Sequence, residues 1–206
     1  MERLTMEVFM SLPMHWKGRA AVLVVFGVGM FIGASPVSAQ QNARLKIERM
    51  PAPTAAMIAT EEKAVLSVLD AFKAAIKGKN ITELRALFYK GDIRWFGSGH
   101  NASRHLSESL SGKQVEAVEP IGAYQAIQDT RFKDLSFEER TYGPQVKTDG
   151  QVATLTFDYD FRVNGVVQNW GTETWQLIRA PEGWRILQLL YSYHLQLVTP
   201  SPERAS

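Results

Sequence analysis

The sequence predicts an α+β fold in which N-terminal helices pack in a strongly curved, mainly antiparallel sheet. Three segments near the C-terminal end combine β-branched or aromatic residues with the alternation of a strand: residues 152–163, 166–179 and 184–196. Short turn sequences, Asn164-Gly165 and residues 180–183, separate them and indicate an antiparallel meander. Strands of about 12 residues extend to roughly 40 Å. Such a sheet must coil around the helices and enclose a cone.

Helical spacing precedes the meander. Thr60 is a suitable N-cap before two glutamates, and Gly78 is a suitable stop. The apolar side chains between them fall on one helical face: Val65, Val68, Leu69, Phe72 and Ile76. Asn80 and Glu83 have the spacing of a capping box, which predicts a second, shorter helix.

Two further strands are expected before the meander. Residues 93–97 predict a short strand, and residues 135–146 predict a longer one that is irregular near Gly143-Pro144. Residues 98–122 are rich in serine, glycine and charge without a sustained period. We assign them to a loop with one helical turn.

The N-terminus has the pattern of a secretory signal. Lys17 and Arg19 precede an apolar run at residues 20–34, and small residues end at Ala39, where cleavage is expected. The run is about 15 residues, short of the roughly 20 that span a membrane. A periplasmic or secreted protein without a stable membrane anchor is therefore predicted, and inner-membrane anchoring through an uncleaved segment is the alternative.

The remaining chain divides into three parts. Residues 40–59 are rich in alanine and proline and predict a flexible linker after the signal peptide at residues 1–39. Residues 60–196 have the size of a single domain, and residues 197–206 are expected to be a disordered tail.

Composition excludes several classes of function. The full chain has 23 basic and 21 acidic residues, and removal of residues 1–39 takes away three of the former and two of the latter. A nearly neutral chain without a Lys/Arg run is a poor partner for nucleic acid. It has no cysteine, so disulfides, thiolate metal sites and thiol nucleophiles are excluded.

Several segments together resemble SnoaL-like domains of the nuclear transport factor 2-like superfamily. The similar segments are residues 65–72, 79–84, 93–97, 149–153, 157–165, 171–175 and 183–186. The resemblance implies a conical α+β half-barrel, usually dimeric, with an apolar pocket at its open end. Many relatives carry histidines where this chain has Gln188 and Leu190, which disfavours their acid–base chemistry here.

Glu173 is the weak candidate for a catalytic group. Strict pairing across Asn164-Gly165 would turn Thr172 and Thr174 toward the Phe157 face, whereas a bulge at Gly171 would turn Glu173 inward. A carboxyl in an apolar pocket has a raised pKa and can act as a general base near neutral pH. The alternative, which we favour about two to one, is a solvated Glu173 or one paired with an arginine such as Arg162.

The candidate ligand-binding residues combine flat rings with a few polar groups: Trp95, Tyr159, Glu173, Trp175, Gln188 and Leu190. Plain core packing is the alternative for the aromatic residues. Asp158 and Asp160 share the face opposite the aromatic residues and are expected to be solvated. His100, His105 and Glu108 fit no strict ligand spacing, so no metal is predicted, and nothing indicates a cofactor.

The sequence therefore predicts an exported SnoaL-like domain that binds a small hydrophobic molecule in its cone. Two alternatives remain open: an isomerase or lyase acting on a hydrophobic carbonyl compound with Glu173 as base, and a structural module for protein interaction. Both faces of the last strand are apolar, which predicts a homodimer.

Overall fold

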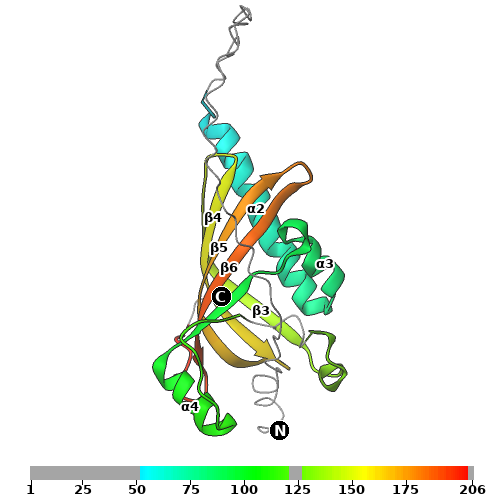
Figure 1. Cartoon of the computed structure of the whole chain (residues 1–206). Coiled ribbons are helices and arrows are strands. Elements are labelled where there is room, and N and C mark those ends of the chain that lie inside the picture. Colours follow the sequence, from blue (N-terminus) through cyan, green and yellow to red (C-terminus); the bar gives the residue numbers. More distant parts are fainter. Residues whose placement is uncertain (1–51, 121–126, 204–206) are drawn as a thin grey trace, which may run out of the picture. The chain divides into compact units, whose positions relative to one another are not determined.

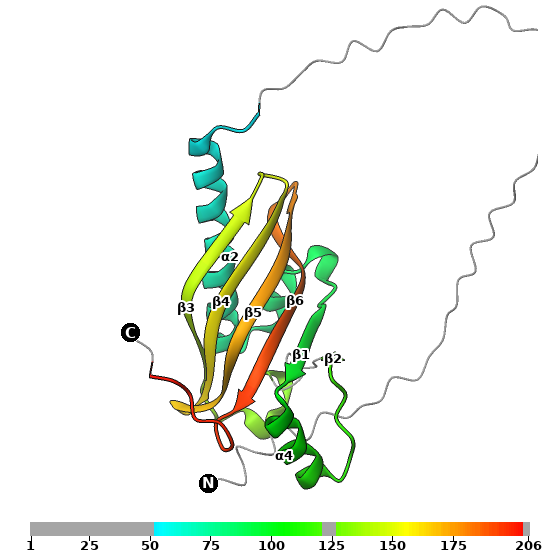
Figure 2. The ribbon, with the colours of Figure 1, turned by 90° about the vertical axis from the view of Figure 1, so that its left-hand side faces the viewer.

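A six-stranded sheet dominates the fold, and one long helix lies against one of its faces (Figures 1 and 2). The computed structural model describes residues 52–120 and 127–203. Its helices are α2 (Ala55–Gly78), α3 (Ile81–Ala86) and α4 (Asn101–Ser111), with 3-10 turns η1 (Tyr89–Gly91) and η2 (Thr130–Phe132). Its strands are β1 (Trp95–Gly99), β2 (Glu119–Pro120), β3 (Phe137–Thr148), β4 (Val152–Val163), β5 (Val166–Ala180) and β6 (Gly183–Leu195).

The strand order confirms the predicted α+β fold class and the meander. The order is β2-β1-β6-β5-β4-β3, in which β3 to β6 pair antiparallel and only β1 pairs parallel, with β6. The sheet is curved and does not close. Figure 2 shows the strands side by side, with α2 behind them. The inner face of the sheet and the buried face of α2 therefore form the core.

Helix α2 begins earlier than predicted. Thr54 accepts a hydrogen bond from the Met57 main-chain N–H at 3.3 Å, and the helix starts at Ala55. Alanines in this stretch favour helix over linker, so the boundary predicted at residue 60 is wrong. Residues 40–51 of the predicted linker and the predicted signal peptide lie outside the described residues. Within those residues, no helix is both long and apolar enough to cross a membrane.

The turn between α2 and α3 carries two caps. Lys79 adopts the left-handed conformation with a φ of 52°, and its Nζ donates to the carbonyl oxygens of Phe132 and Lys133 at 2.8 and 2.9 Å. These two bonds tie the end of α2 to the segment that precedes β3. The Glu83 N–H donates to Asn80 Oδ1 at 3.1 Å, as the capping spacing predicts.

Helix α4 corrects the assignment of residues 98–122 to a loop with one helical turn. It has 11 residues and ends at Gly112, whose φ is 67°. Serine side chains bond back to carbonyls one turn earlier, as Ser109 Oγ does to the His105 oxygen at 2.7 Å. Contacts with β6 stabilise this helix, whose sequence periodicity is weak. Ser103 is fully buried, and its Oγ accepts a hydrogen bond from the Leu195 N–H at 2.9 Å.

The segment after β6 is also more ordered than predicted. Trp170 Nε1 donates to the Thr199 carbonyl at 2.8 Å, and the Gln196 N–H donates to the Gln168 carbonyl at 2.9 Å. The His194 ring stacks between the rings of Trp170 and His100, at centroid distances of 4.2 and 4.7 Å. Thr199 thus ties the segment after β6 to the sheet, while Leu197 and Val198 stay exposed and residues 204–206 are outside the described range.

Three register shifts determine which side chains of the long strands face the core. Gln168 is an extra residue in β5, because Asn169 pairs with Phe161 while Val167 pairs with Arg162. Leu187 is an extra residue in β6, between the pairs Ile186–Leu177 and Gln188–Gln176. In β3 the register shifts across Gly143-Pro144, as the sequence predicts. Each of these bulges exchanges the inner and outer sides of its strand beyond that point.

Gly171 permits the closest approach between β5 and β6. A Cβ atom at this position would overlap the main-chain carbonyl of Ser192. The same carbonyl accepts a hydrogen bond from the Tyr159 hydroxyl at 3.0 Å, and Ser192 Oγ accepts from the Thr172 N–H at 3.1 Å. The strand therefore has little freedom to move away.

We expect Gly171→Ala to lower the free energy of unfolding by about 1–3 kcal/mol or more, because the added methyl group must push two strands apart. Gly78→Ala is the matched control, since a Cβ there meets no atom within 4 Å. It should leave stability unchanged or raise it by up to about 1 kcal/mol. Urea unfolding of the two variants measures the difference, and equal stabilities would contradict the close approach.

Candidate functional site

Two glutamates are buried on the inner face of the sheet, and they define the candidate site. Glu139 lies in β3 and is 6% exposed, and Glu173 lies in β5 and is 1% exposed. Glutamate is rarely buried to this extent without a partner. The bulge at Gln168 turns Glu173 inward, which corrects the solvated or arginine-paired position that the sequence favoured, and this bulge lies three residues before Gly171, where the alternative had placed it.

Glu173 is held by its neighbour on the same strand face. Its Oε2 accepts a hydrogen bond from Trp175 Nε1 at 2.6 Å. Burial raises the pKa of the Glu173 carboxyl to about 8, and the bond from Trp175 opposes that rise. The carboxyl is therefore mainly protonated at neutral pH. Because its pKa lies near neutrality, a small change in pH is enough to change the protonation of this carboxyl.

The described residues form no comparable hydrogen bond to the Glu139 carboxyl. Burial raises the pKa of its carboxyl well above the ordinary value, and a negative charge on Glu173 raises it further, while Lys73 opposes the rise. Its Oε1 atom has no hydrogen-bond partner among the described residues. The two glutamates form a buried carboxyl pair whose charged forms repel each other.

Two buried tyrosines accompany this pair: Tyr159 on β4, the strand between those of the two glutamates, and Tyr191 on β6, next to β1. The Tyr191 ring lies 5.9 Å from the Tyr159 ring and 6.4 Å from the Trp95 ring. Burial raises the pKa of both tyrosines well above 10, and nearby acidic groups raise it further, so their hydroxyls stay neutral. Trp95 Nε1, like Glu139 Oε1, is buried without a partner in the described part of the chain.

Four of the six predicted binding residues lie together in the interior. Trp95, Tyr159, Glu173 and Trp175 are all between 0 and 6% exposed, and Phe72 of α2 packs against both tryptophans. Their inward placement does not test whether they bind a ligand, which stays a prediction.

Gln188 and Leu190 are not on the inner face. The bulge at Leu187 turns Leu189, Tyr191 and Tyr193 inward instead, and Leu190 is 46% exposed. Their expected place on the pocket floor is therefore corrected. The alternation along residues 184–193 could not reveal this, because both faces of that strand are apolar.

Sequence reasoning missed Glu139. A signal existed in the alternation of Phe137, Glu139 and Thr141, which places the carboxyl on the apolar side of β3. Opposite them, Asp160 is on the outer face but is only 2% exposed, which differs from the solvated position expected for it. Burial opposes its charged form, yet hydrogen bonds from Arg162 and Tyr142, both 2.6 Å long, hold its pKa below the ordinary value. Arg162 thus pairs with Asp160 and not with Glu173.

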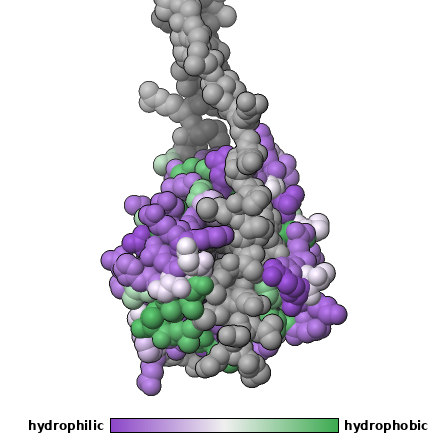
Figure 3. Space-filling view, turned by 60° about the horizontal axis from the view of Figure 1, so that its bottom comes forward, coloured by the Kyte–Doolittle hydropathy of each residue, from purple (hydrophilic) through white to green (hydrophobic). Residues whose placement is uncertain are grey.

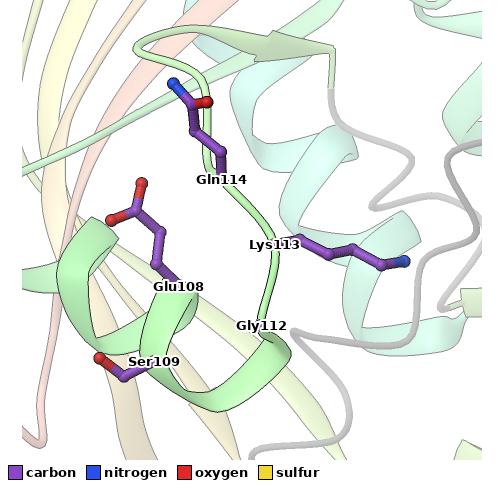
Figure 4. Close-up of a pocket in the computed structure, with 5 residues that line it drawn as sticks. All are labelled: Glu108, Ser109, Gly112, Lys113 and Gln114. Carbon is purple, nitrogen blue, oxygen red and sulfur yellow. The ribbon is translucent and has the colours of Figure 1, made fainter.

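Two hollows in the described surface lie away from the carboxyl pair. One, of about 480 Å³, is open to solvent at the end of α4, where the Glu108 carboxylate faces the following chain and the Lys113 side chain points away from it (Figure 4). The other, of about 400 Å³, lies beside the Gly143 bulge on the outer face of the sheet. His105 approaches Glu108 at 3.3 Å, but the described residues contain no group of three potential metal ligands.

The end of the domain that carries α4 and the C-terminal segment is mostly hydrophilic where it is visible, with a hydrophobic area to one side (Figure 3). Exposed apolar side chains in these two segments are Leu110, Leu197 and Val198.

Comparison with solved structures finds NTF2-like proteins. The chain is similar to an NTF2-like protein of unknown function from Shewanella baltica, with 18% identity and a TM-score of 0.46 over 66% of this chain and 95% of that one. It is also similar to an NTF2-like family protein from Streptomyces avermitilis that is provisionally assigned as a dehydratase, with 14% identity and a TM-score of 0.47 over 67% and 99%. An NTF2-like protein with a cystatin-like fold from Novosphingobium aromaticivorans has 13% identity and a TM-score of 0.42 over 68% and 89%.

These three proteins are described as NTF2-like, and none of the descriptions specifies the SnoaL-like subfamily. No protein-family profile matches the chain, and no curated protein matches it either.

The carboxyl pair predicts an unusual dependence of stability on pH. Glu173 has an ordinary pKa of 4.5 and a pKa of about 8 in the fold, so the folded chain binds the extra proton between these values. The contribution of Glu173 to stability is complete below pH 4.5 and is lost as the pH rises to about 8. Glu139 acts in the same direction.

We therefore expect Glu173→Gln to have nearly the same thermal midpoint as the native chain at pH 5 and a higher one at pH 8.5, because glutamine cannot ionise. Glu138→Gln is the matched control, since Glu138 lies next to Glu139 on the outer side of β3 and is half-exposed. Calorimetry from pH 5 to 9 measures the difference. A constant offset between native and Glu173→Gln proteins at all pH values would refute the raised pKa.

Proposed function

We propose that the interior of this domain binds a small, mainly apolar molecule that carries a polar group. The observation that carries the proposal is the buried Glu139 Oε1 atom, which lacks a partner among the described residues. Leaving such an atom unpaired costs about 1–3 kcal/mol, and native interiors rarely retain that cost without a functional reason. Trp95 Nε1 is a second unpaired atom on the same inner face.

The surroundings support an apolar guest. Phe157 and Phe72 contact the Trp175 ring at centroid distances of 5.3 and 4.8 Å, and Tyr159 and Tyr191 continue this aromatic lining. Rings of this kind offer a large contact area with few degrees of freedom. A bound molecule would gain contact with them while its polar group reaches the carboxyl pair.

The exposure of the tyrosines supports an entrance beside Tyr193. Tyr191 and Tyr193 are each 8% exposed, compared with 0 to 2% for Trp175 and Tyr159 deeper inside. Tyr193 lies against Gly99, where a Cβ atom would meet its ring and hydroxyl at 2.6 Å. Because neither surface hollow is lined by the carboxyl pair, entry requires a movement of these tyrosines.

The test is a screen of small neutral molecules by thermal shift, followed by titration calorimetry of the hits. At least one should raise the thermal midpoint, and Glu139→Gln should weaken its binding by about tenfold or more, since it alters the unpaired oxygen. Glu138→Gln should bind as the native chain does. A screen without hits, together with a crystal structure in which ordered water alone bonds to Glu139, would contradict the proposal.

A second candidate is acid–base catalysis on a hydrophobic carbonyl compound, with Glu173 as the base. The observation that favours it is the pKa of about 8, which lies near physiological pH. Tyr159 supplies no hydrogen to such a substrate in this arrangement, because its hydroxyl already donates to Ser192. Glu139, when protonated, is the available donor.

If this candidate is correct, Glu173→Gln should lower kcat by about 10²- to 10⁴-fold while the dissociation constant of substrate changes little. Isomerisation and dehydration assays on ligands from the screen, read by proton exchange in NMR, provide the measurement. Equal turnover in the native and variant proteins would exclude Glu173 as base.

Export and homodimerisation remain predictions from the sequence, checked by the N-terminal residue of the mature protein and by sedimentation. The structural-module alternative gains weight only if the interior binds nothing.

A further inference from the structure

We propose that the molecule bound in the interior is an organic cation, an ammonium group on an apolar body, received by Glu139 and Glu173 within the surrounding aromatic rings. This inference rests on the proposed function and names its ligand class.

The charges that face the interior are unbalanced. Neither Glu139 nor Glu173 belongs to an ion pair in the described residues. A third carboxyl, that of Glu119 in β2, acts on Tyr191 and Tyr193 from the entrance side.

Each of the two cations near these groups has a polar partner of its own, although Arg104 Nε is buried without one among the described residues. Lys73 of α2 donates to Asp70 at 3.1 Å, and Arg104 of α4 donates to Asn101 at 2.8 Å. Asp160 acts on Glu139 from the outer face and adds negative charge. The interior thus has an excess of carboxyl groups over cations, and a cationic guest would supply what the chain does not.

Once a carboxyl of the pair is ionised, the interior offers several acceptors to a guest. Glu139 Oε1 is unpaired, and the Tyr159 hydroxyl has its hydrogen committed to Ser192, which leaves its oxygen lone pairs. Trp95 Nε1 and Arg104 Nε are buried donors without a partner in the described part of the chain, and Asn169 Oδ1 is a further acceptor of this kind. An ammonium group has hydrogens to give and no lone pairs, so it matches an acceptor-rich site.

The aromatic residues suit the same guest. Trp95, Tyr159, Trp175 and Tyr191 come from four different strands, with Tyr191 within 6.4 Å of the rings of both Trp95 and Tyr159. Ring faces attract cations, most strongly where water is excluded. An anion would instead face two carboxyl groups and these negative ring faces, and a neutral guest would gain nothing from ionising the pair.

Binding of a cation must release a proton. In the free protein Glu173 is mainly protonated below pH 8. An ammonium ion that enters favours the carboxylate, so the carboxyl O–H bond breaks and the proton leaves to solvent while the guest keeps its own. Below pH 8 the affinity should then rise about tenfold per pH unit for each proton released, and it should level off above that pH.

The experiment compares three matched series of increasing size: ethyl-, butyl- and 2-phenylethylammonium, the corresponding alcohols, and carboxylates of the same length. Calorimetry on the full chain at pH 6, 7 and 8, in two buffers of different ionisation enthalpy, gives the affinity and the number of protons released. We expect an ammonium member to bind at least tenfold more tightly than its alcohol at pH 8, with close to one proton released at pH 6 and about half a proton at pH 8, where Glu173 is already half ionised. The carboxylates should not bind.

Variants sharpen the comparison. Glu173→Gln should abolish the pH dependence and the preference for ammonium over alcohol, and Glu138→Gln on the outer side of β3 should change neither. The native chain alone already tests the proposal if Glu173→Gln fails to fold, because the isosteric series needs no variant.

The outcomes separate this inference from the proposed function. Alcohols that bind as tightly as ammonium ions, or ammonium binding without proton release, overturn the cation inference and leave the interior as a binding site. If no member of any series binds, the cation inference is wrong. The screen of neutral molecules described above then tests the proposed function separately.

Discussion

The extra residue at Gln168 is the constraint on which the interior depends. Without it, the strict register from the Asn164-Gly165 turn would place Thr172 and Thr174 on the core side, and Glu173, Trp175 and Leu177 would face outward. With it, the largest buried side chain of the sheet, Trp175, reaches Phe72 of α2 and bonds Glu173 at the same time. A single inserted residue therefore decides both the packing of the core and the presence of an acid within it.

The core has two zones with different chemistry. Toward the β5–β6 hairpin, side chains such as Leu155, Leu177 and Ile186 are fully buried and purely apolar. Toward β1 and α4, the rows of the sheet carry Glu139, Glu173 and tyrosines, and this zone contains the unpaired polar atoms. The purely apolar packing and the buried acids thus occupy different parts of one interior. The apolar zone and the packing of α2 offset the energetic penalty of the buried acids.

The sequence predicted the fold class and the meander well, because alternation and turn residues act locally. It also indicated that Glu173 would face inward if the strand bulged. The position of the bulge could not be predicted, because Gly171 and Gln168 are equally plausible positions for an extra residue on sequence grounds. Helix α4 was missed because tertiary contacts of Ser103 with β6 support it where periodicity does not. Leu190 was misplaced because a strand with two apolar faces hides a change of side at Leu187. Glu139 was overlooked, although its spacing of two residues from Phe137 indicates that both side chains lie on the same face of β3.

The register shift at Gly143-Pro144 also limits edge-to-edge pairing between copies of this chain. Strand β3 is the last in the sheet, so its outward main-chain groups are those that another strand would have to pair with. Proline offers no N–H at that place, and the bend on either side of it prevents a straight partner from following the strand along its whole length. Glu138, Arg140 and Lys147 add charge along the same border. A 12-residue border that would otherwise be a template for amyloid-like growth is thereby divided into two short, charged and mutually twisted pieces.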